Sequence, residues 1–421
     1  MLPSEENERL VRVGPGTPMG DVWRRYWIPC LLSEELPEPD CPPVRVRLLG
    51  EDLVAFRDTG GTVGVVEAFC PHRRAPMFFG RNEENGLRCV YHGWKFNRAG
   101  TCVDMPSEPP DSLFRTKVAI AAYPTHEAAG IVWVYMGPAA LTPPVPDYEL
   151  LRAPATHRFV SKTYEECNWL QALEGGVDTA HISFAHNWDI QHPFLNTIDT
   201  APRVIVEKTP YGYWYAGVRN APGGEYVRLY HYFMPAQQCR PASMMRGRAD
   251  HIPAIEGHIW VPIDDEHTWS WNWAYSNDPD VPLPRAYALE HIERWNGRHP
   301  TDDVGRGYRP KRNKRNDYMI DRNVQKTQTY TGINGVNTQD FALQEGMGPI
   351  VDRSKEHLGS TDRAIIATRQ LLSEAIDEVA AGRMPRGTDP EAYRGLRATE
   401  AVVPPGERWQ DALRPETVAK Y

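Results

Sequence analysis

The chain has 421 residues, and at about 150 residues per domain this length suggests two or three units, of which we expect two. Its 47 basic and 55 acidic residues give a net charge of −8, which argues against a nucleic-acid-binding protein, because such proteins neutralise phosphates with basic side chains. No apolar stretch approaches the length of a membrane span and the N-terminal residues are polar and acidic, so we expect a cytoplasmic protein without a membrane partner.

The N-terminal third of the chain is predicted to form an all-β module preceded by a short helix. Thr17 can cap that helix and Pro18 suits its first turn, while apolar residues recur at helical spacing up to Trp27. Short runs of β-forming residues, such as VRVRLL and GIVWVYMG, then alternate with Gly, Asp, Asn and Pro turns from Val44 to about Met136. This alternation is typical of antiparallel strands.

A Pro-rich stretch, residues 138–155, interrupts the β pattern and predicts a domain boundary. We therefore expect a first domain over residues 1–150 and a second over residues 151–421. The second domain is mixed, with a helical segment at about 164–184, strand-like runs YGYWYAGV and TWSWNWAYS, and a helix at about 361–381. These elements predict an α+β fold whose second domain is built on an antiparallel sheet.

Two cysteine–histidine pairs lie within the β module. Cys70 and His72 are separated by one residue, Cys89 and His92 by two, and sixteen residues separate the pairs. Two thiolates and two imidazoles are the donors of a Rieske 2Fe-2S centre, in which one iron takes the cysteines and the other takes the histidines. A tetrahedral zinc site is the rival functional interpretation, and packed core residues are the structural one.

The segments CPHRR and CVYHGW, which contain these four residues, resemble the Rieske signature of the ring-hydroxylating oxygenases. Arg74 makes the first segment similar to the phthalate dioxygenase branch, and the resemblance continues from RVGPGTPMG to the last helix. It implies the oxygenase (alpha) subunit of a Rieske non-haem iron oxygenase, with one 2Fe-2S cluster and one mononuclear Fe(II). The cysteines outside the motif are expected to be structural thiols: Cys30, Cys41, Cys102, Cys167 and Cys239.

The segment LEGGVDTAHISFAH, residues 173–186, resembles the mononuclear iron motif of the same family, E-x3-D-x2-H-x4-H. His181 and His186 are expected to supply the imidazoles of a 2-His-1-carboxylate facial triad. Five residues advance a regular α-helix by about 500°, so both rings can face one metal only if the helix is distorted there. The resemblance implies Asp340 as third ligand, and nearby acidic residues are its rivals: Glu345, Asp352 and Asp362.

Asp178 lies three residues before His181, where a carboxylate can accept the other ring N–H of that ligand and fix its tautomer. In the resembling oxygenases this aspartate also bonds toward a Rieske histidine of the neighbouring subunit. The resemblance therefore implies a catalytic role for Asp178 in electron transfer and a head-to-tail homotrimer or stacked trimers. A charge on a helix surface is the alternative interpretation.

The resemblance implies an aromatic carboxylate as substrate. A carboxylate is usually bound by the guanidinium group of Arg or the ammonium group of Lys. Lys208, Arg228 and Arg246 lie in the strand region that should wall the pocket, although solvated strand charges are an equal alternative. Trp214 stands where the phthalate enzymes carry Arg, which favours a bulkier ligand such as a methoxylated lignin-derived acid. For such a ligand the same iron site could perform oxidative O-demethylation instead of ring hydroxylation.

An oxygenase and a Rieske electron-transfer protein are the two classes to distinguish. An electron carrier would leave the second iron motif and about 270 further residues unexplained, so the sequence favours an oxidoreductase that hydroxylates a phthalate-like aromatic carboxylate, as a dioxygenase or monooxygenase of aromatic hydrocarbon catabolism. No NAD or flavin fingerprint is visible in the sequence. We therefore expect electrons from NAD(P)H to arrive through a separate reductase or ferredoxin.

Overall fold

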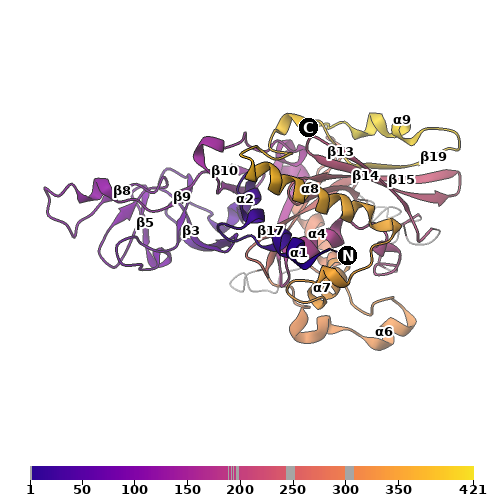
Figure 1. Ribbon diagram of the computed structural model, residues 1–421, viewed down its shortest axis with the longest axis horizontal. Helices are drawn as coiled ribbons and strands as arrows, with labels where there is room; N and C mark the ends of the chain where they lie inside the picture. The colour runs from indigo at the N-terminus through magenta and orange to yellow at the C-terminus, as the bar shows by residue number, and fades with distance from the viewer. Residues whose placement is uncertain are drawn as a thin grey trace. The chain divides into compact units, whose positions relative to one another are not determined.

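The computed structural model describes residues 2–187, 189–190, 192, 194–195, 199–242, 252–298 and 308–421 (Figure 1). The chain divides into two compact units, one formed by Val13–Val145 and the other by Met1–Arg12 together with Pro146–Tyr421. The first twelve residues, which we expected within an N-terminal domain, thus belong to the larger unit. Within the described ranges, no helix combines the length and the apolar character needed to cross a membrane.

The smaller unit, here called the β unit, consists of three antiparallel sheets and the predicted short helix, α2 (Pro18–Trp23). Thr17 caps α2 by accepting a hydrogen bond from the backbone N–H of Gly20 at 3.2 Å. In strand order, the sheets are β2 (Val44–Leu48), β3 (Glu51–Arg57), β4 (Val63–Glu67) and β9 (Ala122–Tyr123); β5 (Arg81–Glu83), β6 (Gly86–Arg88), β7 (Lys95–Phe96) and β8 (Cys102–Asp104); and β1 (Trp27–Leu32), β11 (Ile131–Tyr135) and β10 (Thr125–Ala128). The predicted β fold of this region is confirmed.

The larger unit is built on an eight-stranded antiparallel sheet, as the strand-like runs of the sequence predicted. Its strand order is β12 (Arg158–Glu165), β18 (Thr268–Ser276), β17 (Ala254–Pro262), β16 (Gln237–Ala242), β15 (Gly224–Phe233), β14 (Gly212–Ala221) and β13 (Arg203–Thr209), with β19 (Thr399–Val403) paired to β15. Helices surround the sheet: α1 (Ser4–Val11), α3 (Glu149–Arg152), α4 (Trp169–Val177), α5 (Arg285–Tyr287), a π-helix (Ala288–Arg294), α6 (Arg322–Thr327), α7 (Val336–Gly346), α8 (Arg363–Ala380) and α9 (Trp409–Leu413). The fold class is therefore α+β.

The expected helix at 164–184 is shorter than predicted. Residues up to Glu165 belong to β12, because RFVSKTYE pairs along its whole length with β18 and carries β-branched and aromatic residues that suit a strand. Helix α4 begins after Asn168, whose side chain accepts a hydrogen bond from the N–H of Leu170 at 3.0 Å. It ends at Val177, before either histidine of the iron motif.

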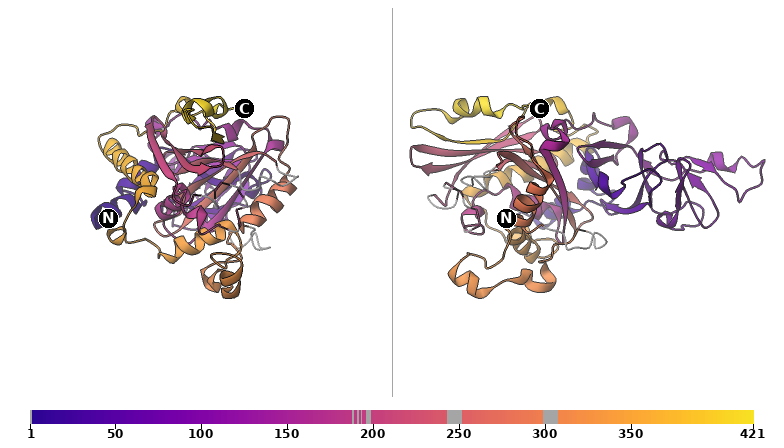
Figure 2. Two further views of the ribbon diagram at one scale, coloured as in Figure 1. Left: turned by 90° about the vertical axis from the view of Figure 1, so that its right-hand side faces the viewer. Right: turned by 180° about the vertical axis from the view of Figure 1, so that it is seen from behind.

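The two faces of the sheet are covered by different helices (Figure 2). Helix α4 packs on one face against β16, β17 and β18, and we call this the α4 face. The opposite face carries Trp214 and its apolar neighbours on β14 and β15, which pack against Trp409 of α9. Residues that alternate along a strand point to opposite faces, so the strand register decides which side chains can reach the space under α4.

Helix α4 is held by a buried ion-pair network. Glu174 accepts hydrogen bonds from Nη2 of Arg353 at 2.8 Å and from Nε of Arg369 at 2.6 Å. Burial raises the pKa of Glu174, but the two guanidinium groups lower it more, so its pKa lies below the usual value. Arg353 also donates to Oδ1 of Asn7 in α1 at 2.9 Å. The network therefore joins α4 to the first helix of the chain and to α8.

Candidate functional site

The first candidate site lies on two similar turns of the β unit. The N–H of Cys70 donates to the carbonyl of Ala75 at 2.9 Å, and the N–H of Arg74 donates back to the carbonyl of Cys70 at 2.9 Å. The second turn repeats this pattern, because the N–H of Cys89 donates to Trp94 at 2.8 Å and the carbonyl of Cys89 accepts from Gly93 at 2.9 Å. Each turn presents one cysteine and one histidine.

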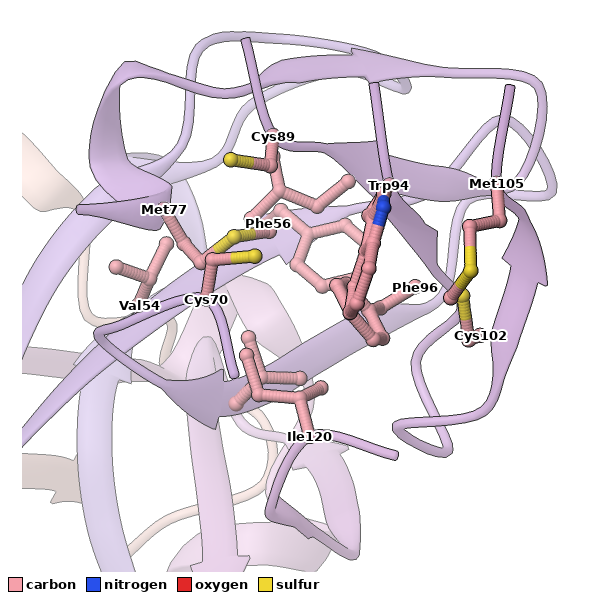
Figure 3. Packing of buried hydrophobic residues seen from close by; sticks show 12 residues of the cluster. Val54, Phe56, Cys70, Met77, Cys89, Trp94, Phe96, Cys102, Met105 and Ile120 are labelled. Atoms are coloured by element: carbon pink, nitrogen blue, oxygen red, sulfur yellow. The ribbon is translucent and has the colours of Figure 1, made fainter. Parts of the chain in front are cut away.

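The four side chains of these turns converge. Figure 3 shows Cys70 and Cys89 approaching from separate segments within one buried cluster, and Cys102 lying apart beside Met105. The rings of His72 and His92 lie 4.4 Å apart between centroids. Nδ1 of His72 is buried and finds no hydrogen-bond partner within the described part of the chain. An orphaned imidazole nitrogen beside two buried thiols fits a metal cluster, which would supply the missing partner.

The thiols also need a positive charge to ionise. Burial is the largest influence on Cys70 and raises the pKa of its thiol to about 11, with Cys89 contributing in the same direction. Metal ligands must be thiolates, and a buried thiolate pair is stable only when a cation compensates it. Two thiols on one side and two imidazoles on the other match the donors of a 2Fe-2S cluster of the Rieske type better than a simple structural core.

The second candidate site lies in the larger unit and brings His181, His186 and Asp340 together. One ligand atom from each residue lies within 4.8 Å of the others. Oδ1 of Asp340, on α7, is 3.0 Å from Nε2 of His186 and 3.6 Å from Nε2 of His181. Two imidazoles and a carboxylate in this arrangement can occupy one face of an octahedral Fe(II), which leaves positions for O2 and an organic ligand.

The backbone between the two histidines is not a regular α-helix. His181 begins a 3-10 turn that ends at Ser183, and the chain then continues in a further turn to His186. The distortion predicted from the spacing is therefore present. Arg219 holds the chain just before His181 on the sheet by donating to the carbonyl of Thr179 at 2.6 Å, and the hydroxyl of Thr179 lies 3.0 Å from that of Tyr230.

Two of the three residues have their remaining polar atom held by a hydrogen bond, and the third has a carboxylate beside it. Oε1 of Gln339 accepts from Nδ1 of His186 at 2.6 Å, and Nδ2 of Asn337 donates to Oδ2 of Asp340 at 3.0 Å. Oδ2 of Asp178 lies 3.4 Å from Nδ1 of His181, where the charges attract although the geometry is not that of a hydrogen bond. These neighbours leave three converging atoms free for a metal, two Nε2 atoms and Oδ1 of Asp340.

Electrostatics favour a carboxylate anion in both acidic residues. Burial raises the pKa of Asp340, but His186 and then His181 lower it more, so its pKa falls well below the usual value. Burial also raises the pKa of Asp178. The adjacent His181 lowers it by more, so the pKa of Asp178 lies below its usual value. Both side chains are therefore ionised at neutral pH, as a metal ligand and its supporting carboxylate must be.

The rival carboxylates have other partners. Glu345 accepts from the N–H of Glu166 at 2.9 Å and from the hydroxyl of Tyr318. Asp352 accepts from Ser354 and pairs with Lys355, while Asp362 accepts from the N–H of Gly359 at 2.6 Å. Among the three rivals and Asp340, only Asp340 belongs to the described cluster that could hold a metal ion.

A pocket of about 650 Å³, including the open solvent at its mouth, lies between the α4 face of the sheet and helices α4 and α7. Its lining includes all three residues of the second site together with Asp178. The sheet contributes polar and aromatic side chains: Arg228, Tyr230, Gln238, Arg240, His258, Trp260 and Ser270. Nε of Arg228 and Nε of Arg240 are buried and have no hydrogen-bond partner among the residues described.

The predicted substrate residues differ in where they lie. Arg228 lines the pocket, whereas Lys208 lies on the edge strand β13 and pairs with Glu374 of α8 at 2.5 Å. Trp214 is paired with His231 and so points to the face opposite Tyr215 and Tyr230, where it packs against α9. The expectation that Lys208 and Trp214 contact the substrate is therefore corrected, because neither residue lines the pocket. Arg246 lies outside the described residues.

Two glycines near the end of α4 allow this helix to pack closely against its neighbours. A Cβ on Gly176 would lie 2.0 Å from the ring of Trp260, and a Cβ on Gly175 would lie 2.1 Å from Nε2 of Gln344. Both glycines therefore let α4 approach β17 and α7 closely. This close approach sets the height of the iron motif above the sheet.

Sequence reasoning missed Gln339, Asn337, Arg240 and His258. The first two flank Asp340 within one helical turn, so their proximity to that residue was available from the sequence. Arg240 and His258 lie in strands β16 and β17, where every second residue points to the α4 face. In the buried run AIEGHIWVP, the polar residues Glu256 and His258 two positions apart were the available signal.

Comparison with protein families matches two models to this chain. The model described as "Rieske [2Fe-2S] domain" matches residues 26–124, and the model described as "LigXa C-terminal domain like" matches residues 134–419. The chain is 40% identical to the 3-chlorobenzoate-3,4-dioxygenase oxygenase subunit of Comamonas testosteroni, with 98% of each chain covered. It is also 40% identical to the phthalate 4,5-dioxygenase oxygenase subunit of Pseudomonas putida, over 98% of this chain and 94% of the relative.

A third relative has a different reaction in its name. The chain is 32% identical to the 5,5'-dehydrodivanillate O-demethylase oxygenase subunit of Sphingobium sp., over 98% of this chain and 88% of the relative. Among solved structures, the chain resembles NdmB of Pseudomonas putida CBB5 with a TM-score of 0.63 at 19% identity, covering 91% of this chain and 97% of that one. At this identity the structural likeness concerns the fold alone.

Proposed function

The chain belongs to the Rieske non-haem iron oxygenase family, and we propose that two groups of its residues hold the two metal sites of that family. It is an oxygenase subunit, an oxidoreductase with a 2Fe-2S cluster and a mononuclear iron. The proposed cluster ligands are Cys70, His72, Cys89 and His92. The proposed iron ligands are His181, His186 and Asp340, supported by their convergence within 4.8 Å.

When bound, the cluster supplies single electrons and the mononuclear iron supplies a site for O2 beside the substrate. The residues of the chain orient and protect that site. Gln339 and Asn337 fix the ring of His186 and the carboxylate of Asp340, so that their free atoms face one point. Arg219 and Tyr230 hold Thr179, two residues before His181, on the sheet, and Trp260 and Phe341 contribute apolar pocket walls that exclude water.

We also assign a connecting role to Asp178. Its carboxylate lies beside His181, lines the pocket, and has 22% of its side-chain surface exposed, so a second polar group can reach it. A Rieske histidine of a neighbouring subunit is the group we propose, in a head-to-tail homotrimer in which each cluster serves the iron of the next chain. We propose a separate ferredoxin or reductase as the electron donor, since the sequence shows no NAD or flavin fingerprint.

The substrate we propose is an aromatic carboxylate. The observation that carries this proposal is the pair Arg228 and Arg240, two guanidinium groups on the α4 face that line the same pocket as the iron ligands. Arg228 lies 3.9 Å from Glu400 and Arg240 pairs with Glu256 at 3.3 Å, but neither Nε atom has a hydrogen-bond partner among the described residues, so both can still donate to a carboxylate. Two relatives at 40% identity are named for phthalate and 3-chlorobenzoate, which are both aromatic carboxylates.

Oxidative O-demethylation is the second candidate reaction, favoured by the 5,5'-dehydrodivanillate O-demethylase relative. One atom of O2 hydroxylates a methoxy carbon and the other becomes water with two electrons and two protons. The resulting hemiacetal collapses to a phenol and formaldehyde. Ring dihydroxylation instead places both oxygen atoms on the substrate, so the two reactions leave different products.

Product analysis tests the proposal. The holoprotein is supplied with O2, NADH and a surrogate reductase, and is incubated with benzoate, phthalate and methoxybenzoates under identical conditions. We expect oxygenated product from at least one aromatic carboxylate and none from the corresponding carboxamide. A dihydrodiol identifies ring attack, and stoichiometric formaldehyde identifies demethylation. Carboxamides oxidised as fast as the acids would contradict the aromatic-carboxylate proposal.

A further inference from the structure

A row of directly paired polar residues crosses the α4 face beside the iron ligands. Gln238 of β16 pairs with His258 of β17, His258 pairs with Asn272 of β18, and Asn272 pairs with Ser161 of β12. Directly opposed residues of antiparallel strands point to the same face. Gln238 and His258 line the pocket, while Asn272 lies behind His258, and all three are buried.

The hydrogen bonds of Asn272 fix the tautomer of His258. Nδ2 of Asn272 donates to the carbonyl of Ser270 at 3.3 Å, and a carbonyl oxygen can only accept. The amide nitrogen therefore faces that side, where the hydroxyl of Thr163 lies 3.2 Å away as well. Oδ1 of Asn272 consequently faces Nδ1 of His258 at 2.9 Å. Nδ1 must carry a hydrogen, because an oxygen and a bare ring nitrogen would repel each other.

The imidazole of His258 is also neutral. Burial is the largest influence and lowers its pKa well below the usual value, and the positive charges of Arg240 and Arg298 lower it further. In a neutral ring with hydrogen on Nδ1, Nε2 has a lone pair and no hydrogen. No residue of the described ranges donates a hydrogen bond to Nε2, so this atom is an available acceptor in the pocket lining.

Gln238 supplies an adjacent acceptor. Its Nε2 donates to the carbonyl of Gly176 at 2.6 Å and to the hydroxyl of Tyr215, so the orientation of the amide is fixed. Oε1 is then left buried, and no described residue donates to it. A buried acceptor without a donor is costly, and natural proteins leave one mainly where a ligand or water completes it. Two residues that line the pocket on neighbouring strands thus each have an acceptor without a donor, and the arginines of the same pocket can only donate.

We propose that His258 and Gln238 accept hydrogen bonds from a ring substituent of the substrate. The preferred substrate is therefore an aromatic acid that also carries a hydrogen-bond donor, such as a hydroxyl or amino group. The inference rests on the proposed function, because the arginines of the same pocket would hold the carboxylate while another part of the ring reaches this row. A substrate with hydrogen, halogen or methyl in place of the donor leaves both acceptors unpaired.

Matched ligands test this preference. Equilibrium binding to the anaerobic holoprotein is measured by calorimetry for 2-, 3- and 4-hydroxybenzoate and for the corresponding fluorobenzoates, which are similar in size but carry no donor. We expect at least one hydroxybenzoate to bind about 10-fold more tightly than its fluoro partner. In His258→Leu this ratio should fall to about one, whereas His267→Leu, which alters a half-exposed histidine outside the pocket, should preserve it.

A second variant keeps the test valid if His258→Leu does not fold. In Asn272→Asp, a carboxylate faces Nδ1 and favours a protonated ring, so Nε2 becomes a donor. The hydroxybenzoate advantage should then shrink, and ligands with an acceptor substituent, such as phthalate, should gain affinity. The visible absorption of the cluster and the iron content verify that each variant is folded.

The outcomes separate the two proposals. Hydroxybenzoates and fluorobenzoates that bind equally well to the wild type would overturn the donor preference but leave the aromatic-carboxylate proposal intact. A hydroxyl preference that persists in both His258→Leu and Asn272→Asp would overturn the role of His258. Absence of binding by every benzoate at millimolar concentrations would overturn the aromatic-carboxylate proposal and this inference with it.

Discussion

Gln339 accepts a hydrogen bond from Nδ1 of His186 at 2.6 Å and lies one residue before Asp340 in the same helix. Its amide nitrogen donates to the carbonyl of Ile333 at 2.8 Å and to Asp189 at 2.7 Å, so its orientation is unambiguous. One turn of α7 thus supplies the proposed ligand Asp340 and also Gln339, which orients the ring of the second proposed ligand, His186.

Gln339→Leu should weaken iron binding. Without the acceptor, the ring of His186 loses its fixed tautomer and orientation, and such supporting groups typically contribute about 10-fold to 100-fold in metal affinity. Titration of the iron-depleted protein with Fe(II) measures this loss, while the visible bands of the cluster should not change. Gln328→Leu, an exposed glutamine after α6, is the control. Equal Fe(II) affinity in the two variants would show that Gln339 has no such role.

Asp178→Asn should retain both metals and lose turnover by about 100-fold. The amide is nearly the same size, so the fold persists, but it removes the negative charge beside His181 and the proposed link to the neighbouring cluster. Iron analysis and the cluster spectrum test retention, and a single-turnover assay with prereduced protein tests electron transfer. Asp199→Asn alters an acidic residue outside the pocket and should behave as wild type. Wild-type rates in Asp178→Asn would refute the assignment.

Arg240→Met should weaken benzoate binding by about 10-fold to 100-fold, because a hydrogen bond to a charged group contributes more than one between neutral groups. Benzamide, which has no charge, should bind the variant and the wild type similarly. Calorimetry on the anaerobic holoprotein measures both ligands. If the two ligands lose affinity equally, Arg240 shapes the pocket without recognising the carboxylate.

Gly176→Ala should destabilise the larger unit, because its Cβ would lie 2.0 Å from the ring of Trp260. Overpacking of this kind typically lowers the unfolding temperature of a unit this size by about 5 °C. Displacement of α4 should also reduce iron occupancy. Gly346→Ala at the end of α7 is the matched control, since its Cβ would meet no atom within 4 Å. Differential scanning calorimetry and iron analysis compare the two, and equal unfolding temperatures would contradict the prediction.

Glu165→Gln should stabilise the protein more as the pH rises. Glu165 is fully buried, and burial followed by the charge of Glu345 raises its pKa well above the usual value. A group with a raised pKa in the folded state stabilises that state below its unfolded pKa and loses this contribution as pH rises through the folded value. Glutamine resembles the protonated form at every pH. The difference in unfolding temperature between variant and wild type should therefore grow from pH 5 upward, and a constant difference would exclude this role.

The four proposed cluster ligands could be identified as candidates from the sequence because each cysteine and its histidine are separated by at most two residues. His181 and His186 could be proposed for the same reason, and the distortion between them followed from helix geometry. Asp340 lies more than 150 positions further on, and its assignment depended on resemblance. Gln339 was missed because a glutamine beside a ligand has no distinctive chemistry until the direction of its side chain is known.

The error at Trp214 has a different cause. In YGYWYAGVR, aromatic residues occupy three successive positions, so alternation cannot show which side chains face the pocket. Only the pairing of Trp214 with His231 and of Tyr215 with Tyr230 reveals the faces. The start of the expected helix at 164–184 was also misplaced, because strand pairing of β12 with β18 outweighed local helical spacing.

The buried contact between Asn7 and Arg353 means that the β unit is an insertion. The chain enters the larger unit, leaves it at Arg12 and returns at Pro146. During synthesis, residues 13–145 can fold as soon as they emerge, whereas α1 must wait for more than 150 further residues before α4 exists and for more than 340 before Arg353 does. The β unit is joined to the larger unit at two points of the chain, after Arg12 and before Pro146. Replacing it with the β unit of a relative would therefore require both junctions to be kept.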